Sequence, residues 1–106
     1  PADRDYKSLD RMVLGMIPDR SQKFKAPEPV QPKGKPAKES LDHFLKSRKR
    51  TIEYMKNTAG LRDHVMDSPL GKQMDGYQWL LFIAGHSDRH LKQILEVKAD
   101  ANFPGK

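Results

Sequence analysis

Two long stretches of this sequence repeat apolar residues every three or four positions, and this spacing constrains the fold more than any other feature. The stretches cover residues 40–59 and 75–98. No window alternates apolar and polar residues as a half-buried strand would. We therefore predict an all-α fold with two long helices, each of which carries an apolar stripe that needs a partner.

Local signals mark the ends of these two helices. Ser40 is expected to N-cap the first, because its hydroxyl can accept a hydrogen bond from a free backbone N–H of the first turn, and Gly60 is placed to end it. Asp75 or Gly76 is expected to open the second. The polar residues between them are predicted to form a loop.

A third, shorter helical pattern precedes the first long helix. It covers residues 8–17, with Ser8 as the expected N-cap, and a proline closes it. Residues 18–39 then hold five prolines among Lys and Gln, at Pro18, Pro27, Pro29, Pro32 and Pro36. Such a composition favours extended conformations, so we expect a crossing linker.

A chain of 106 residues can build one domain with a small core. Two helices cannot cover each other's stripes completely, and the second is apolar almost all round between Trp79 and Ala84. At least two more helices are therefore expected, either upstream in a longer protein or from a second copy in a homodimer.

The sequence excludes cysteine-based sites and does not predict a membrane-spanning segment. With no cysteine there is no disulfide, no zinc-thiolate site and no cysteine nucleophile, so a metal would have to be held by His, Asp or Glu. No apolar stretch approaches the roughly 20 residues of a membrane span. The sequence begins at Pro1 without a methionine, so any export signal would lie upstream, and both a cytoplasmic and an exported location stay open.

The net charge of +6 permits a phosphate-rich partner. Most of the surplus lies in two stretches, Lys23–Lys38 and Lys46–Arg50. Neither is interleaved with the aromatic residues that stack on bases, so the sequence does not favour nucleic-acid binding. A basic adaptor for nucleic acid or acidic protein is the third of three functional hypotheses.

His86 and His90 interrupt the apolar pattern of the second long helix. Residues four apart lie on one helix face, about 6 Å apart at Cβ, so both imidazoles can reach one ion at about 2.0–2.1 Å. They follow the stripe of Ile83, Ile94 and Val97, and we expect them to face other helices. The alternative is a chance pair that hydrogen-bonds to neighbouring groups.

The spacing alone does not specify a peptidase. Ser87 stands where an HExxH protease has its glutamate, and Asp88 points away from both histidines as a solvated charge. A metal site needs at least three protein ligands, and His64, in the preceding loop, is the candidate for the third. His43 is expected at a helix boundary or surface.

The segment "DGYQWLLFIAGHSDRHLKQILEVKADANFP" resembles the last helix of the DinB-like superfamily, which includes YfiT-type metal-dependent hydrolases and bacillithiol or mycothiol S-transferases. The resemblance implies a bacterial protein with an up-down-down-up four-helix bundle. It also implies a divalent metal, often nickel or zinc, held by three histidines. His86 and His90 match two of them, and the third would lie before Pro1. The chain would then be the later half of the fold.

The resemblance gives the first functional hypothesis, a metal-dependent transferase or hydrolase. Because the chain has no cysteine, a transferred thiol would have to be a small-molecule cosubstrate. The second hypothesis is a non-catalytic helical module that dimerises to complete its bundle. In such a dimer two pairs of histidines could hold one ion in a closed site.

Overall fold

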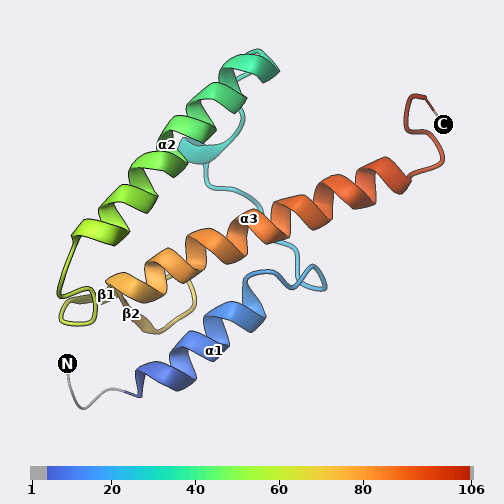
Figure 1. Cartoon of the computed structure of the whole chain (residues 1–106). Helices are drawn as coiled ribbons and strands as arrows, with labels where there is room; N and C mark the ends of the chain where they lie inside the picture. The colour runs from blue at the N-terminus through green and yellow to red at the C-terminus, as the bar shows by residue number, and fades with distance from the viewer. Residues whose placement is uncertain (1–4, 106) are drawn as a thin grey trace. The chain divides into compact units, whose positions relative to one another are not determined.

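The computed structural model of the chain describes residues 5–105. In chain order its elements are α1 (Tyr6–Met16), the 3-10 turn η1 (Glu28–Val30), α2 (Ala37–Asn57), β1 (Val65–Asp67), β2 (Gln73–Asp75) and α3 (Gly76–Ala99) (Figure 1). The three helices dominate, and the strands form only a small two-stranded sheet. The predicted all-α class, with one short and two long helices, is confirmed: the described chain is predominantly helical.

The chain divides into two compact units. The first, called the core unit here, runs up to Lys23 and continues from Gly60. The second, called the crossover unit, is Phe24–Ala59. It contains η1 and α2, so α2 is described separately from α1, the hairpin and α3.

Helix α1 begins earlier than the sequence suggested. Its N-cap is Asp5, whose carboxylate accepts a hydrogen bond from the backbone N–H of Ser8 at 3.1 Å. Ser8, the expected cap, therefore lies inside the first turn. A carboxylate three residues before a free N–H fills the capping role equally well, so the helix extends to Tyr6.

Helix α2 also begins before its expected cap. Pro36 is the N-cap and accepts a hydrogen bond from the Ser40 N–H at 3.1 Å, so Ser40 lies within the first turn. The helix ends at Asn57, before Gly60, whose φ of +73° belongs to the turn that follows. The predicted crossover 18–39 is therefore shorter at its C-terminal end.

Two short strands, which the sequence pattern did not indicate, lie between α2 and α3. β1 and β2 pair antiparallel with Met66 opposite Met74, and Ser68 and Lys72 close the turn between them. Each strand has three residues, which is too short to show an alternating pattern in the sequence. The hairpin nevertheless matters, because β2 leads directly into α3.

Helix α3 begins at Gly76, as the sequence indicated. Asp75 and Gln78 form a capping box in which the Asp75 carboxylate accepts from the Gln78 N–H at 2.8 Å and the Gln78 side chain accepts from the Asp75 N–H at 2.9 Å. Both residues are buried. The start of the helix is thereby fixed in the core unit.

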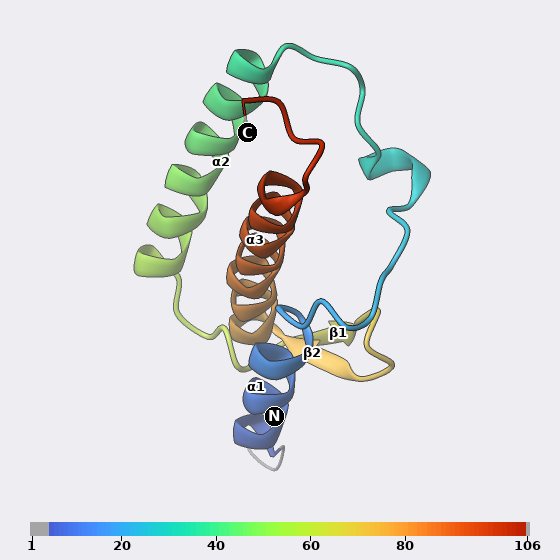
Figure 2. The same ribbon diagram turned by 90° about the vertical axis from the view of Figure 1, so that its right-hand side faces the viewer.

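The core lies where α1 packs beside the first half of α3, and both views show these helices side by side (Figures 1 and 2). Val13, Ile17 and Met74 are buried, and four partly buried residues pack around them: Leu70, Trp79, Leu81 and Phe82. Gly85 permits the close approach, because a Cβ there would lie 3.1 Å from Cβ of Ile17. The core unit thus depends on a small residue in the middle of α3.

Arg62 joins three elements of the core unit, and we call this cluster the Arg62 clasp. Its Nη1 and Nη2 donate to the two carboxylate oxygens of Asp10 at 2.8 Å each, and Nη1 also reaches Asp75 at 3.2 Å. The guanidinium lies between the rings of Tyr6 and Tyr77, at 4.5 and 4.1 Å from their centroids. The clasp therefore links the start of α1 to the start of α3.

A second set of contacts holds the segment after α1 against α3. The buried Arg89 side chain donates to the backbone carbonyls of Asp19 and Gln22. Arg20 donates to both carboxylate oxygens of Glu96 at 3.1 and 3.2 Å. Together these contacts fix the rotation of α3 about its axis, and hence the direction in which its histidines point.

Candidate metal centre

His86 and His90 lie one turn apart on α3 and point their Nε2 atoms at each other across 2.9 Å. Two imidazole nitrogens that bind one zinc ion at about 2.0–2.1 Å would be about 2.9 Å apart at a right angle and about 3.3 Å apart at the tetrahedral angle. The observed separation fits two adjacent ligands of a single ion. It also fits a hydrogen bond between one protonated and one unprotonated nitrogen.

The other ring nitrogen of His90 contacts Gln93. Nδ1 lies 3.1 Å from Oε1 of this glutamine, which is three residues further along the same helix. Metal-binding histidines usually donate their second ring N–H to such an oxygen acceptor. Gln93 was not predicted from the sequence, although its spacing of three residues from His90 places it on the same face.

An aromatic series connects His86 to the core. The ring of Phe82 lies nearly parallel to the His86 imidazole, with centroids 6.0 Å apart and planes at 17°. Trp79 contacts Phe82 in turn, at 5.7 Å between centroids. Trp79 and Phe82 pack on the core, and Phe82 also flanks His86, so one side of the histidine pair is continuous with the core.

The protonation of His86 is biased toward the neutral form. Partial desolvation of its ring lowers the pKa below the ordinary value of 6.5, and electrostatic repulsion from His90 and Arg89 lowers it further. A neutral imidazole has a free lone pair, which is the form that binds a metal.

Both histidines are exposed in the structure, so the expectation that they face other helices is not met within the described chain. Ile94 and Val97, on the same stripe, are each 56% exposed. The stripe that holds the histidines is therefore largely uncovered in residues 5–105.

Within residues 5–105 the pair has no third ligand beside it. Among residues 5–105, no three or more His, Cys, Asp or Glu side chains are grouped so that they could hold one ion. His64 lies in the turn before β1 and does not join the pair, and His43 lies on α2 in the crossover unit. Ser87 donates its hydroxyl to the Ile83 carbonyl at 3.1 Å, and Asp88 pairs with a lysine on the solvated side.

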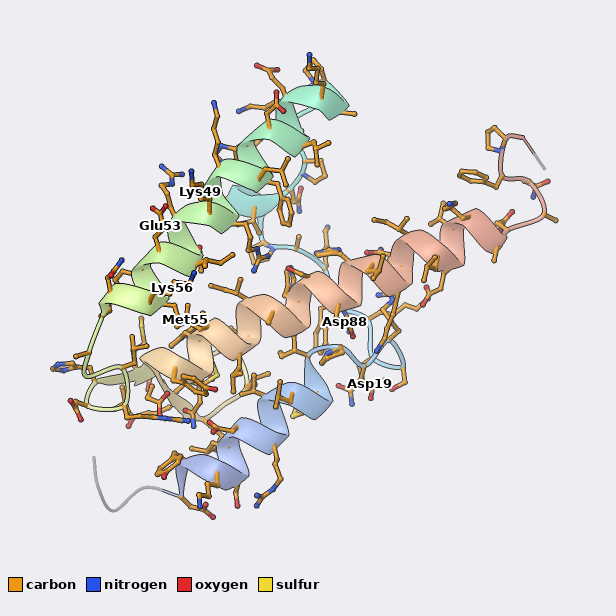
Figure 3. The ribbon with its side chains drawn as sticks, in the orientation of Figure 1. Asp19, Lys49, Glu53, Met55, Lys56 and Asp88 are labelled. Atoms are coloured by element: carbon orange, nitrogen blue, oxygen red, sulfur yellow. The ribbon has the colours of Figure 1, made fainter. Side chains whose placement is uncertain are left out.

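His43 does take part in a different surface feature. It lines an open, mostly basic groove along α2 together with Lys46, Lys49, Arg50 and Glu53. In the side-chain view Lys49 and Glu53 project from this helix (Figure 3). Across the part of the chain that is described, no helix has the length and apolarity to cross a bilayer.

Comparison with known proteins gives a consistent result. The family model for the DinB superfamily matches residues 5–94. The chain is similar to the uncharacterized protein YuaE of Bacillus subtilis, with 30% identity over 101 residues, which cover 91% of this chain and 61% of that protein. It thus spans less than two thirds of this relative's length. No solved structure gives a significant match. The family match covers most of the sequence, and the chain belongs to the DinB superfamily.

Proposed function

We propose that the chain is part of a metal-dependent transferase or hydrolase, in which His86 and His90 bind a divalent ion, nickel or zinc. One observation carries the proposal: the two Nε2 atoms converge at 2.9 Å on an exposed face of α3. Membership of the DinB superfamily supports it. The remaining ligand is proposed to come either from a part of a longer chain outside residues 5–105 or from a second copy of this chain.

A divalent ion with open coordination positions would polarise a bound substrate and lower the pKa of a bound thiol or water. The residues of this chain would hold the ion and orient the two imidazoles. Phe82 flanks the His86 ring on the side toward the core, with nearly parallel planes and centroids 6.0 Å apart. Arg89 donates to backbone carbonyls of the segment after α1 and so ties α3 to that segment. A thiol substrate would be a small molecule, since the chain has no cysteine.

The direct test is metal binding by single-histidine variants. We expect zinc and nickel, measured by equilibrium dialysis, to bind the wild-type chain and to be lost from His86→Ala and His90→Ala. His43→Ala, which removes a histidine from the surface of α2, is the matched control and should bind as the wild type does. Circular dichroism checks that helicity is kept. Equal binding by all four proteins would rule out the site.

A dimeric module is the second candidate, because the later half of α3 leaves an apolar surface open. Leu91, Ile94, Leu95 and Val97 are each more than half exposed. If two copies pair through this surface, two pairs of histidines could enclose one ion and leave no position for a substrate. The ratio of metal to chain decides: one ion per two chains favours the closed dimer, and one ion per chain favours an open site.

A further inference from the structure

Gln93 reaches the side of the His90 ring that is remote from His86. Its Oε1 lies 3.1 Å from Nδ1, while His90 Nε2 lies 2.9 Å from His86 Nε2. Both nitrogens of His90 are therefore engaged, each with a different partner. His90 is held at two points, and Gln93 provides one of them.

The chemistry of the glutamine oxygen determines where the proton on His90 sits. A carbonyl oxygen only accepts hydrogen bonds, so Nδ1 of His90 must be the donor. A neutral imidazole has one N–H, which leaves the His90 Nε2 with a free lone pair. In the pair, His86 Nε2 is then the donor. The two histidines therefore carry their protons on different nitrogens.

We propose that Gln93 is a positioning residue that holds His90 in the Nδ1–H tautomer and so presents its Nε2 lone pair to a metal. His90 is ready to bind without any proton shift. His86 must first move its proton from Nε2 to Nδ1. The order of ligation follows: His90 binds first and His86 second. The role toward metal rests on the proposed function, whereas the tautomer of His90 can be measured without metal.

The size of the effect follows from ordinary hydrogen-bond strength. One neutral hydrogen bond shifts a tautomer equilibrium by up to about tenfold. Removal of such an outer partner of a histidine ligand usually weakens metal affinity by about 10–100-fold. An exposed glutamine without this role would change neither quantity.

The experiment compares three proteins by NMR and by zinc titration. Two-bond 1H–15N correlations of the imidazoles report the tautomer of His90 in the metal-free wild type, Gln93→Met and Gln93→Glu. Methionine has a similar length but no strong acceptor, and glutamate keeps the acceptor. We expect the Nδ1–H form in the wild type and Gln93→Glu, and a mixture of both tautomers in Gln93→Met. Lys98→Met, in the last turn of α3, is the control for a general change of the helix.

Zinc affinity should fall in Gln93→Met, return in Gln93→Glu and stay unchanged in Lys98→Met. The inference is overturned if wild-type His90 is in the Nε2–H form, or if Gln93→Met changes neither tautomer nor affinity. If zinc binds all variants equally, the proposed metal function stands and the role of Gln93 fails. If the tautomer shifts as expected but no variant binds zinc, the control of His90 by Gln93 is supported and the metal function fails.

Discussion

The core unit and the crossover unit both contain helices with an apolar stripe, but only the core unit buries part of that stripe. α1 has 11 residues and buries Val13 completely against α3 and the hairpin. α2 has 21 residues, all of them described, and none is buried. Its apolar side chains are exposed at Leu41, Phe44, Leu45, Ile52, Tyr54 and Met55. An apolar stripe in the sequence therefore predicts a helix but does not predict that the helix is buried. Burial also requires another element that packs on the stripe, as α3 packs on α1.

The two units also differ in charge. The crossover unit has nine Lys and Arg against four Asp and Glu, which accounts for +5 of the net charge of +6. The core unit is nearly balanced, and several of its carboxylates bind arginines from other elements, as in the Arg62 clasp. Charge in the core unit joins segments, whereas Lys49, Glu53 and Lys56 project from α2 (Figure 3).

The largest effect should come from the same substitution made once in each unit. Met74 is 0% exposed and lies in the core, while Met55 on α2 is 42% exposed. Met74→Ala should lower the free energy of unfolding by about 2–5 kcal/mol, because it removes buried apolar area and leaves a cavity. Met55→Ala should change it by less than about 0.5 kcal/mol. Urea unfolding followed by circular dichroism measures both.

The unfolding free energies of these two variants test whether α2 is really unpacked while the core unit is packed. A loss in Met55→Ala as large as that in Met74→Ala would show that α2 is packed in solution, against another part of a longer chain or a second copy. A small loss in both would mean that the core unit does not rely on the Met74 contacts. Only a clear difference between the two variants preserves the contrast between the units.

A smaller, pH-dependent effect is expected from the Arg62 clasp. Hydrogen bonds from the Arg62 guanidinium are the main cause that lowers the pKa of Asp10 below its ordinary value of 3.8. A carboxyl with a lowered folded-state pKa stabilises the fold fully above its unfolded pKa, and the stability is lost as pH falls through the folded value. Asp10→Asn should cost roughly 1.5–3 kcal/mol at pH 6 and progressively less as the pH falls below about 4.

The measurement is the urea midpoint of wild type and Asp10→Asn between pH 6 and pH 2.5. Other carboxylates also titrate in this range, so the difference between the two proteins isolates Asp10. Asp42→Asn, on α2, is the charge-matched control, and its offset from the wild type should stay small at pH 6. A difference between wild type and Asp10→Asn that is constant with pH would contradict the linkage.

The features that the sequence predicted well depend on local chemistry. The start of α3 was predicted at Asp75 or Gly76, and it is locally determined, because Asp75 and Gln78 are three residues apart and form the capping box by themselves. The starts of α1 and α2 were predicted too late. Asp5 caps α1 with its side chain, and α2 begins directly after Pro36 without a side-chain cap. The hairpin was missed because three-residue strands are too short to show their period.

In the candidate site, too, the local features could be predicted from the sequence and the long-range features could not. The spacing of His86 and His90 was readable because a helix repeats every 3.6 residues and brings the two rings together. The contact with Gln93 depends on side-chain rotamers, which a helical pattern does not specify. A third ligand depends on long-range packing. His64 was suggested by closeness in sequence, and the described fold does not bring it to the pair.

The smallest expected effect concerns the ion pair between Arg20 and Glu96. The Glu96 side chain is 51% exposed, and solvent weakens such pairs, so Glu96→Gln should lower the urea midpoint only slightly. The decrease should shrink in 1 M salt, where charges are screened within about 3 Å. Glu53→Gln on α2 is the matched control and should lower the midpoint less. Because the pair joins the segment after α1 to the last turns of α3, amide hydrogen exchange should quicken there first. A shift of the urea midpoint as large as that of Asp10→Asn, or one that salt leaves unchanged, would mean that this segment holds the end of α3 far more firmly than its exposure implies.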